Sequence, residues 1–323
     1  MSQIIEGNIR LNKLFPKKYR SKKILEIGGG YNPLAPKSKG FNTKTVDHDT
    51  AENIYKKYKA QIENNIYSKN NKVEYVDYVW KGEFLDNIIK ERFDIVIASH
   101  VIEHIPNVLS FLKSTSNLIN NDGIVSLAVP DKRYTFDYFR YPSEFGLAVD
   151  NYNNKVSKHS DGDVYNNFGY NCQKNGLSSW SHNDGHGEFK IPIKFEDIKK
   201  QMKLNDSTYV DAHKWVFTPS SFKLFISEAN KLGITSLKIV DFFETRGNEF
   251  IVHLSLADEQ NKYIEDREFL IKNSFFEVCE SYNQAKENEI NFDKKDINYY
   301  LNSIILKLKF FLNPLIKIYK RIE

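Results

Sequence analysis

The chain has 323 residues, of which 41% are hydrophobic and 27% charged, and its formal net charge is +4. This composition is typical of a globular protein, and so small a charge excludes a chain that binds nucleic acid over its whole surface. The two distant cysteines, Cys172 and Cys279, exclude a disulfide framework, and no apolar segment suits a secretory signal or a membrane span, so the sequence predicts a soluble cytoplasmic protein.

Five short apolar segments alternate with stretches that are mostly long enough for crossover helices. The segments cover residues 23–29, 43–47, 73–79, 93–99 and 124–129. Short apolar segments that end in glycine, an acid or proline are typical of strands buried on both faces of a sheet. Their alternation with helices, one of them expected from Pro106 to Leu118, predicts a parallel sheet with right-handed crossovers.

Residues 131–217 differ from the preceding sequence, because aromatic residues, Gly, Asn, Asp and His dominate and the periodicity is weak. We expect a long substrate-side insertion over the strand ends. The elements that follow it are a helix from 218 to 232 and two strands at 235–243 and 249–256 joined as a hairpin. The prediction is a doubly wound, mostly parallel seven-stranded α/β sheet in a domain over 1–257, with a helical extension over 258–323.

Glycines and acids stand near the carboxyl ends of the predicted strands, where open α/β sheets bind ligands. Glu26, Gly28 and Gly30 belong to the glycine turn after the first strand, and glycines let the backbone approach a ligand closely. Asp47 ends the second strand, at about the spacing from a glycine turn that suits an acid accepting from both ribose hydroxyls. Asp77 near the end of the third strand and Ser99 at the end of the fourth complete the predicted cofactor site.

The strand order and these motifs resemble the class I S-adenosylmethionine (SAM) dependent methyltransferases over residues 23–256. Four further sequence motifs resemble those of a bacterial subgroup of methyltransferases that is associated with glycosyltransferases and surface-polysaccharide synthesis. They are YNPLAP (31–36), SHVIEHIP (99–106), VPDKRYTFDYFR (129–140) and HKWVFTPSSF (213–222). The resemblance implies that SAM is the cofactor. Glu26 would accept from its ammonium group, Asp77 would meet the adenine amino group, and Ser99 would line the methionine region. Pro33 replaces the third glycine of nicotinamide-binding folds, which disfavours that alternative.

His100, Glu103 and His104 are spaced i, i+3 and i+4, so a helix would place them on one face. Two imidazoles and a carboxylate could bind a divalent metal. The segment is similar to the Glu-x-x-Glu-His of some metal-dependent methyltransferases, with His100 in place of the first Glu. The alternatives are a metal-free acid–base role for His100 or His104, and a purely structural role.

Asp131 and Arg133 follow the fifth strand, where Asp131 could act as a base and Arg133 could bind an anionic acceptor. A solvated charged turn explains them equally well. His213 is expected to reach the acceptor, while Trp215 and Phe217 could stack on a sugar or pack in the core. The same choice holds for the aromatic residues of the insertion, at positions 134, 136, 138, 139, 141, 165, 170 and 180.

Two segments suggest further contacts. His182, Asp184, His186 and Glu188 could bind a metal, although such a glycine-rich stretch is more often a flexible loop. Residues 304–321 mix Leu, Ile and Phe with Lys, and could lie on the inner face of an anionic membrane or pack on the domain.

The predicted function is therefore O-methylation of a sugar in a surface glycan or its precursor, with SAM and, in one alternative, a divalent metal. There are two alternatives. The protein could methylate another small molecule or a lipid, or it could be a SAM-binding, non-catalytic partner of a glycosyltransferase. The predicted catalytic residues are His100, His104, Asp131 and His213.

Overall fold

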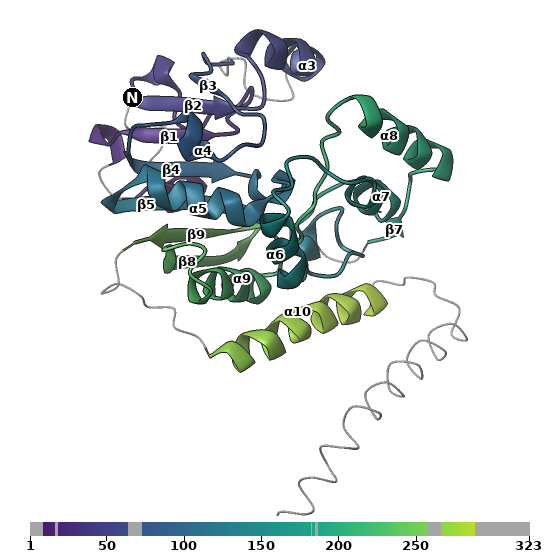
Figure 1. Cartoon of the computed structure of the whole chain (residues 1–323). Helices are drawn as coiled ribbons and strands as arrows, with labels where there is room; N and C mark the ends of the chain where they lie inside the picture. Colours follow the sequence, from purple (N-terminus) through teal and green to yellow (C-terminus); the bar gives the residue numbers. More distant parts are fainter. Residues whose placement is uncertain are drawn as a thin grey trace, which may run out of the picture.

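A computed structural model describes residues 9–16, 19–63, 73–181, 183–184, 187–256 and 266–287. Its centre is a seven-stranded sheet in the order β3-β2-β1-β4-β5-β9-β8 (Figure 1). The strands are β1 (Ile24–Ile27), β2 (Thr43–Asp47), β3 (Tyr78–Val79), β4 (Phe93–Ser99), β5 (Ile119–Pro130), β8 (Lys238–Arg246) and β9 (Glu249–Ser255). β1 to β5 pair in parallel and β9 is antiparallel to both its neighbours, which confirms the predicted fold class.

The strand predictions differ from the structure mainly in the third and fifth strands. β3 is limited to two residues that pair with β2, so Asp77 precedes the strand instead of lying near its end. β5 begins at Ile119, five residues before the predicted strand at 124–129. An edge strand with one neighbour can be short because few of its backbone groups need partners, whereas β5 is paired on both sides.

Each face of the sheet has its own apolar core, and β4 shows why. Ile95 and Ile97 belong to one cluster, whereas Val96 and Ala98 belong to the other, as the two-residue period of a strand requires. The larger core includes α5 (Val108–Leu118) and α9 (Pro219–Lys231). The remaining helices before the insertion are α2 (Ile9–Leu14), α3 (Ala51–Glu63) and α4 (Leu85–Ile88), with single 3₁₀ turns at Tyr19–Ser21, Lys37–Lys39, Ile102–His104 and Lys132–Tyr134.

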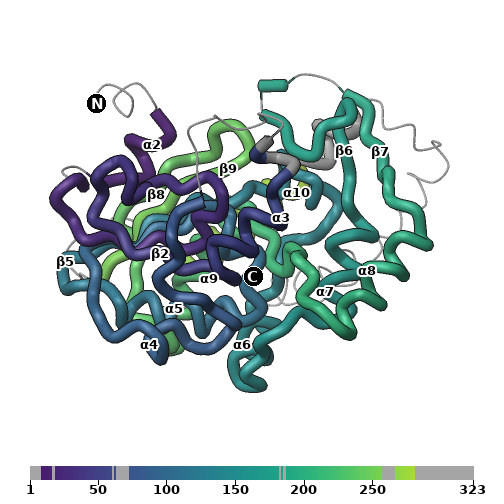
Figure 2. Tube along the Cα trace, turned by 90° about the horizontal axis from the view of Figure 1, so that it is seen from above, coloured from purple at the N-terminus to yellow at the C-terminus, as the bar shows by residue number. Residues whose placement is uncertain are grey.

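The insertion is more regular than its sequence predicts. It contains α6 (Phe145–Asn153), α7 (Asp161–Gly169), α8 (Phe195–Ser207) and a small sheet of β6 (Gln173–Lys174) and β7 (Phe189–Lys190). In Figure 1, α7 and α8 lie beyond the carboxyl ends of the parallel strands, and Figure 2 shows these two helices side by side.

Most of the aromatic side chains that could have stacked on a sugar pack in the interior of the protein instead. Tyr134, Tyr138 and Trp180 form a small separate core with Cys172, and Phe139 and Phe189 pack against it. Trp215 and Phe217 are fully buried in the main core. Packing, the alternative explanation in the sequence analysis, is therefore correct for these side chains.

The described part of the C-terminal extension is α10 (Arg267–Glu287), which packs against α9. Glu277 accepts hydrogen bonds from the backbone and hydroxyl of Ser220 at the start of α9, and Leu270 is buried. The tail predicted to contact a membrane, 304–321, lies outside the described residues. Within the described part of the chain, no helix has both the length and the apolar content needed to cross a bilayer.

Candidate functional site

A cavity of about 780 Å³ opens where β1, β2 and β4 end, and the insertion closes its other side. Its lining residues on the sheet side include Gly28, Gly30, Asp47, His48, Trp80, His100 and His104. Those from the insertion include Ser157, Lys158, Asp206, Ser207, Thr208, Tyr209 and Asp211. The volume is that of a site for a cofactor-sized molecule.

The glycine turn after β1 forms one wall of this cavity. Gly28 has a φ of 71°, and a Cβ on it would lie 2.5 Å from Cγ2 of Val101, so no other residue fits without displacement. Gly30 also has a positive φ, and its backbone N–H donates to Oδ2 of Asp47 at 2.9 Å. Asp47 is buried at the end of β2, and its Oδ1 lies 2.6 Å from Nδ1 of His48. The structure therefore places Gly28, Gly30 and Asp47 together in the cavity, where the predicted cofactor contacts require them.

Glu26 has a different position from the one predicted. It is buried beneath the turn, and its two carboxylate oxygens accept from the backbone N–H groups of Leu34 and Ala35 at 2.6 and 3.0 Å. Burial raises its pKa to about 7, against the lowering effect of these two hydrogen bonds. Glu26 is not among the residues that line the cavity, so it holds the turn in place instead of meeting the cofactor's ammonium group.

Asp77 and Ser99 are also displaced from their predicted roles. The carboxylate of Asp77 pairs with Lys37 and Lys44 and accepts from the backbone of Thr45 at 2.8 Å, outside the cavity lining. The hydroxyl of Ser99 accepts from the guanidinium of Arg10 at 2.7 Å. Trp80, after β3, occupies the cavity wall where an acid was expected.

His100 lies in the cavity wall in a strained backbone conformation. Its φ is 53°, a value that non-glycine residues rarely adopt. Its Nε2 is 2.8 Å from Oε2 of Glu249, and its Nδ1 is 3.7 Å from Oε1 of Glu103. Burial alone would lower the pKa of His100, but Glu249 and Glu103 outweigh it and raise that pKa. Such strain persists only where the surroundings impose it, and it is concentrated at functional sites.

Behind this wall lies a buried group of imidazoles and carboxylates. Oε1 of Glu103 is 3.8 Å from Nε2 of His104 and 3.9 Å from Nε2 of His213, and the two imidazole rings meet edge to face at 4.6 Å. Nδ1 of His213 is 2.5 Å from Asp137, and Nδ1 of His104 is 2.9 Å from Asp211. His104 lines the cavity, whereas His213 and Glu103 lie behind it.

The electrostatics of His104 follow from these neighbours. Burial lowers its pKa, but Asp211 and Glu103 favour the charged imidazolium and raise the pKa to about 9. The contact between His104 and Asp211 also shifts the pKa of Asp211. Burial raises this pKa, but the imidazolium of His104 lowers it by more, so the net effect is a lower pKa. In the absence of another cation, His104 is therefore protonated at neutral pH.

The predicted metal set must be corrected. The three residues were expected on one helix face, but Ile102–His104 form a single 3₁₀ turn, and His100 lies between two carboxylates, with Nε2 2.8 Å from Glu249 and Nδ1 3.7 Å from Glu103. The side chains whose ligand atoms all lie within 4.8 Å of one another are Glu103, His104 and His213. In the second predicted cluster, His182 and His186 lie outside the described residues, and Glu188 is exposed.

Comparison with known proteins identifies the family. A family profile described as "Methyltransferase domain" matches residues 9–222, about two thirds of the chain. The chain belongs to this methyltransferase family. Membership confirms the predicted enzyme class, a methyltransferase.

Individual relatives are distant. A ubiquinone biosynthesis O-methyltransferase from Glaesserella parasuis is 27% identical over 122 residues, which are 38% of this chain and 48% of that protein. This methyltransferase thus matches about half the length of its curated relative. A SAM-dependent methyltransferase from Clostridium acetobutylicum shares 11% identity, with 79% of this chain and 90% of that chain covered and a TM-score of 0.37. The CcbJ methyltransferase from Streptomyces caelestis also shares 11%, with 73% and 89% covered and a TM-score of 0.37.

Asp131 of this methyltransferase is not placed to act as a base. It is fully buried, accepts two hydrogen bonds from Nε and one terminal nitrogen of Arg133, and accepts from the hydroxyl of Thr245 at 2.6 Å. Neither Asp131 nor Arg133 lines the cavity. The predicted base and anion clamp are therefore a structural ion pair that fixes the end of β5.

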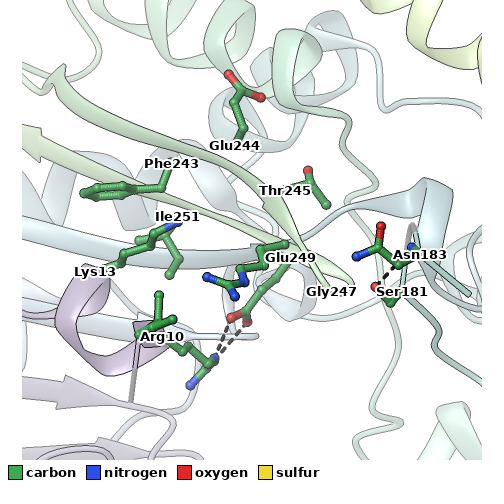
Figure 3. Close-up of a pocket in the computed structure, with 12 residues that line it drawn as sticks. Arg10, Lys13, Ser181, Asn183, Phe243, Glu244, Thr245, Gly247, Glu249 and Ile251 are labelled. Atoms are coloured by element: carbon green, nitrogen blue, oxygen red, sulfur yellow. Dashed lines mark hydrogen bonds and ion pairs between the residues drawn. The ribbon is translucent and has the colours of Figure 1, made fainter. Parts of the chain in front are cut away.

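A second hollow of about 840 Å³ lies between α2 and the β8–β9 hairpin (Figure 3). Figure 3 shows Arg10 reaching Glu249 near its centre, and Nη2 of Arg10 is 2.9 Å from Oε2 of Glu249. This hollow contains neither the glycine turn nor Asp47. Because Glu249 also contacts His100 of the first cavity, the Arg10–Glu249 pair separates the two spaces.

Sequence reasoning missed three acids of the site, Asp137, Asp211 and Glu249. Asp211 could have been found, because it stands only two residues from His213 in the sequence. Asp137 lies in a segment whose 3₁₀ turn and short turns show no period, and Glu249 begins β9 far along the chain. Only the folded sheet brings these two acids to the histidines.

Proposed function

We propose that this methyltransferase binds SAM between the glycine turn and Asp47 and O-methylates a hydroxyl group of a sugar in a glycan or its precursor. The observation that carries the proposal is a group of three histidines, each contacting a carboxylate: His100 and His104 line the cavity, and His213 lies directly behind it. A hydroxyl acceptor must lose its proton during in-line methyl transfer, and it therefore needs a base or a metal beside it. An amine acceptor needs such groups less.

The wall contributed by the insertion supports a hydroxylated acceptor. Ser157, Lys158, Ser207, Thr208 and Tyr209 line the cavity. The Lys158 ammonium and the Ser207 and Thr208 hydroxyls donate to backbone carbonyls, which leaves the two hydroxyl oxygens able to accept from a ligand. Hydroxyl and ammonium groups suit the many hydrogen bonds of a sugar, and an aromatic ring suits its apolar face. The resemblance to methyltransferases associated with glycosyltransferases supports the same class of acceptor.

The second candidate is O-methylation of a phenolic small molecule. It is favoured by the match to the ubiquinone biosynthesis O-methyltransferase over part of the domain. The polar side chains along the wall of the insertion favour the sugar, because a hydroxylated ligand can donate to their oxygens and an apolar ligand cannot. The glycosyltransferase partner and the membrane contact through 304–321 stay predictions.

Methyl transfer to defined acceptors tests the proposal. Purified protein is incubated with SAM and either sugar nucleotides and oligosaccharides or a catechol, and S-adenosylhomocysteine and methylated product are measured by mass spectrometry. We expect methylated sugar with wild type and much less with Asp47→Ala at a SAM concentration that does not saturate the variant. Methylation of the catechol without any methylated sugar would replace the proposal by the second candidate.

A further inference from the structure

Glu103 is a buried carboxylate whose two oxygens have no hydrogen-bond donor among the described residues. Its side chain is fully buried, and both Oε1 and Oε2 lack a partner. Its position is fixed from behind, because its backbone carbonyl accepts from the N–H groups of Lys214 and Trp215 at 2.8 and 3.1 Å. A carboxylate left without hydrogen bonds in the interior costs several kcal/mol, so the fold keeps Glu103 for a ligand that compensates it.

The imidazoles around Glu103 are held for the same ligand. His104 and His213 both present Nε2 to Oε1 of Glu103, because their Nδ1 atoms are engaged by Asp211 and Asp137. Asp137 is in turn fixed by Arg140, whose Nη1 donates to it at 2.7 Å. An imidazole with one nitrogen bound to a carboxylate and the other free is the usual state of a metal-ligating histidine.

The distances around Glu103 are those of side chains spaced to bind a metal ion, as well as of ion pairs. Imidazolium–carboxylate hydrogen bonds are about 2.7–2.9 Å long. Nδ1 of His213 lies 2.5 Å from Asp137, and Nδ1 of His104 forms an ion pair with Asp211 at 2.9 Å. The contacts of Glu103 with His104 and His213 are 3.8 and 3.9 Å, too long for hydrogen bonds. Two ligand atoms at about 2.1 Å from a tetrahedral Zn²⁺ are roughly 3.4 Å apart, close to the observed spacing.

We infer that Glu103, His104 and His213 bind one divalent transition-metal ion, with Asp137 and Asp211 orienting the two imidazoles. Two imidazoles and one carboxylate suit Zn²⁺, Mn²⁺ or Co²⁺ better than Mg²⁺ or Ca²⁺. Three protein ligands leave a coordination position open, and His104 places it at the cavity. The site itself is independent of the acceptor. Its use rests on the proposed O-methylation, in which the ion lowers the pKa of the acceptor hydroxyl.

Direct metal binding tests the inference without any acceptor. Untagged full-length protein is dialysed against a chelator and titrated with Zn²⁺ and then Mn²⁺ by calorimetry, with a SAM titration as the check of folding. We expect one ion per chain, an affinity at least 100-fold weaker in Glu103→Gln and His213→Ala, and a loss of about 10- to 100-fold in Asp137→Asn, which keeps every ligand atom. His100→Ala, outside the set, should change the affinity less than about threefold.

The outcomes separate the site from the proposed function. The site would be overturned if the wild type bound no ion. It would also be overturned if Glu103→Gln and Asp137→Asn bound SAM and still bound Zn²⁺ as tightly as wild type. An equal loss in His100→Ala and His213→Ala would overturn the ligand set. If the protein binds the metal but does not methylate a sugar, the metal site is supported and only the proposed acceptor is wrong.

Discussion

Asp47 is hydrogen-bonded to Gly30 across the ends of two strands: Oδ2 of the acid accepts from the glycine N–H at 2.9 Å. The bond ties the end of β2 to the turn after β1 and sets both at the cavity wall. The acid is nevertheless at the cavity surface, where it can accept further hydrogen bonds. The other acid predicted for the cofactor, Asp77, pairs with two lysines outside the cavity.

The pair Asp47→Ala and Asp77→Ala therefore tests the cofactor site. Hydrogen bonds to a charged acceptor contribute about 1.5–3 kcal/mol each, so Asp47→Ala should weaken SAM binding by roughly 10- to 100-fold. Asp77→Ala should leave the dissociation constant within about twofold. Calorimetric titration of SAM measures both, and equal losses in the two variants would contradict the assignment.

The backbone of His100 gives a prediction about stability. Its φ of 53° costs an alanine about 1 kcal/mol but a glycine almost nothing. Both substitutions lose the contact with Glu249, so His100→Gly should be more stable than His100→Ala by about 1 kcal/mol. Urea unfolding measures the difference. Lys56, inside α3, is the control, and there glycine should be the less stable of the two residues.

More of the fold than of the site could be predicted from the sequence, because the fold follows from local patterns and the site depends on residues that are distant in the chain. β4 and the Gly28 turn carry local signals, an apolar segment and glycines that meet Val101, and both are found where predicted. His213 and Glu103 are over a hundred residues apart, and no local pattern shows that they meet. The chain between them forms α6 to α8, whose short helices the sequence does not mark by a strong period. His100, a local neighbour of Glu103, is therefore predicted from the sequence as the third metal ligand in place of the distant His213.

Glu26 gives a prediction for the pH dependence of stability. Its pKa is about 7 in the fold against 4.5 in the unfolded chain, so between these pH values only the folded state retains the proton. The free energy of unfolding should therefore fall as pH rises from 4.5 to 7, by up to about 3 kcal/mol from this group. Glu26→Gln cannot titrate.

Urea unfolding of both proteins across that range measures the contribution, because the other carboxylates titrate alike in each. The free energy of unfolding of wild type, taken relative to that of Glu26→Gln, should fall steadily by up to about 3 kcal/mol between pH 4.5 and pH 7. A difference that stays constant would show that Glu26 has an ordinary pKa.

Lys214 and Asp163 form a buried ion pair that joins the His213 segment to α7. Nζ of Lys214 is 2.7 Å from Oδ2 of Asp163, and both side chains are buried. Asp163→Ala leaves the lysine charge without its partner, which should cost about 3–5 kcal/mol. The double variant with Lys214→Met removes the charge as well and should recover most of that loss. The exposed pair of Glu196 and Lys199 is the control, and Glu196→Ala should cost less than about 0.5 kcal/mol.

Thermal and urea unfolding give these values, and the methyl-transfer assay shows what the pair does for the site. Lys214 directly follows His213, so loosening it should move the imidazole from Glu103 before it disturbs the glycine turn. Asp163→Ala should therefore reduce methyl transfer while its affinity for SAM, measured below its unfolding temperature, stays near that of wild type. Equal losses of SAM binding and turnover would mean that the insertion and the sheet unfold as one unit, and that the pair has no separate effect on the histidines.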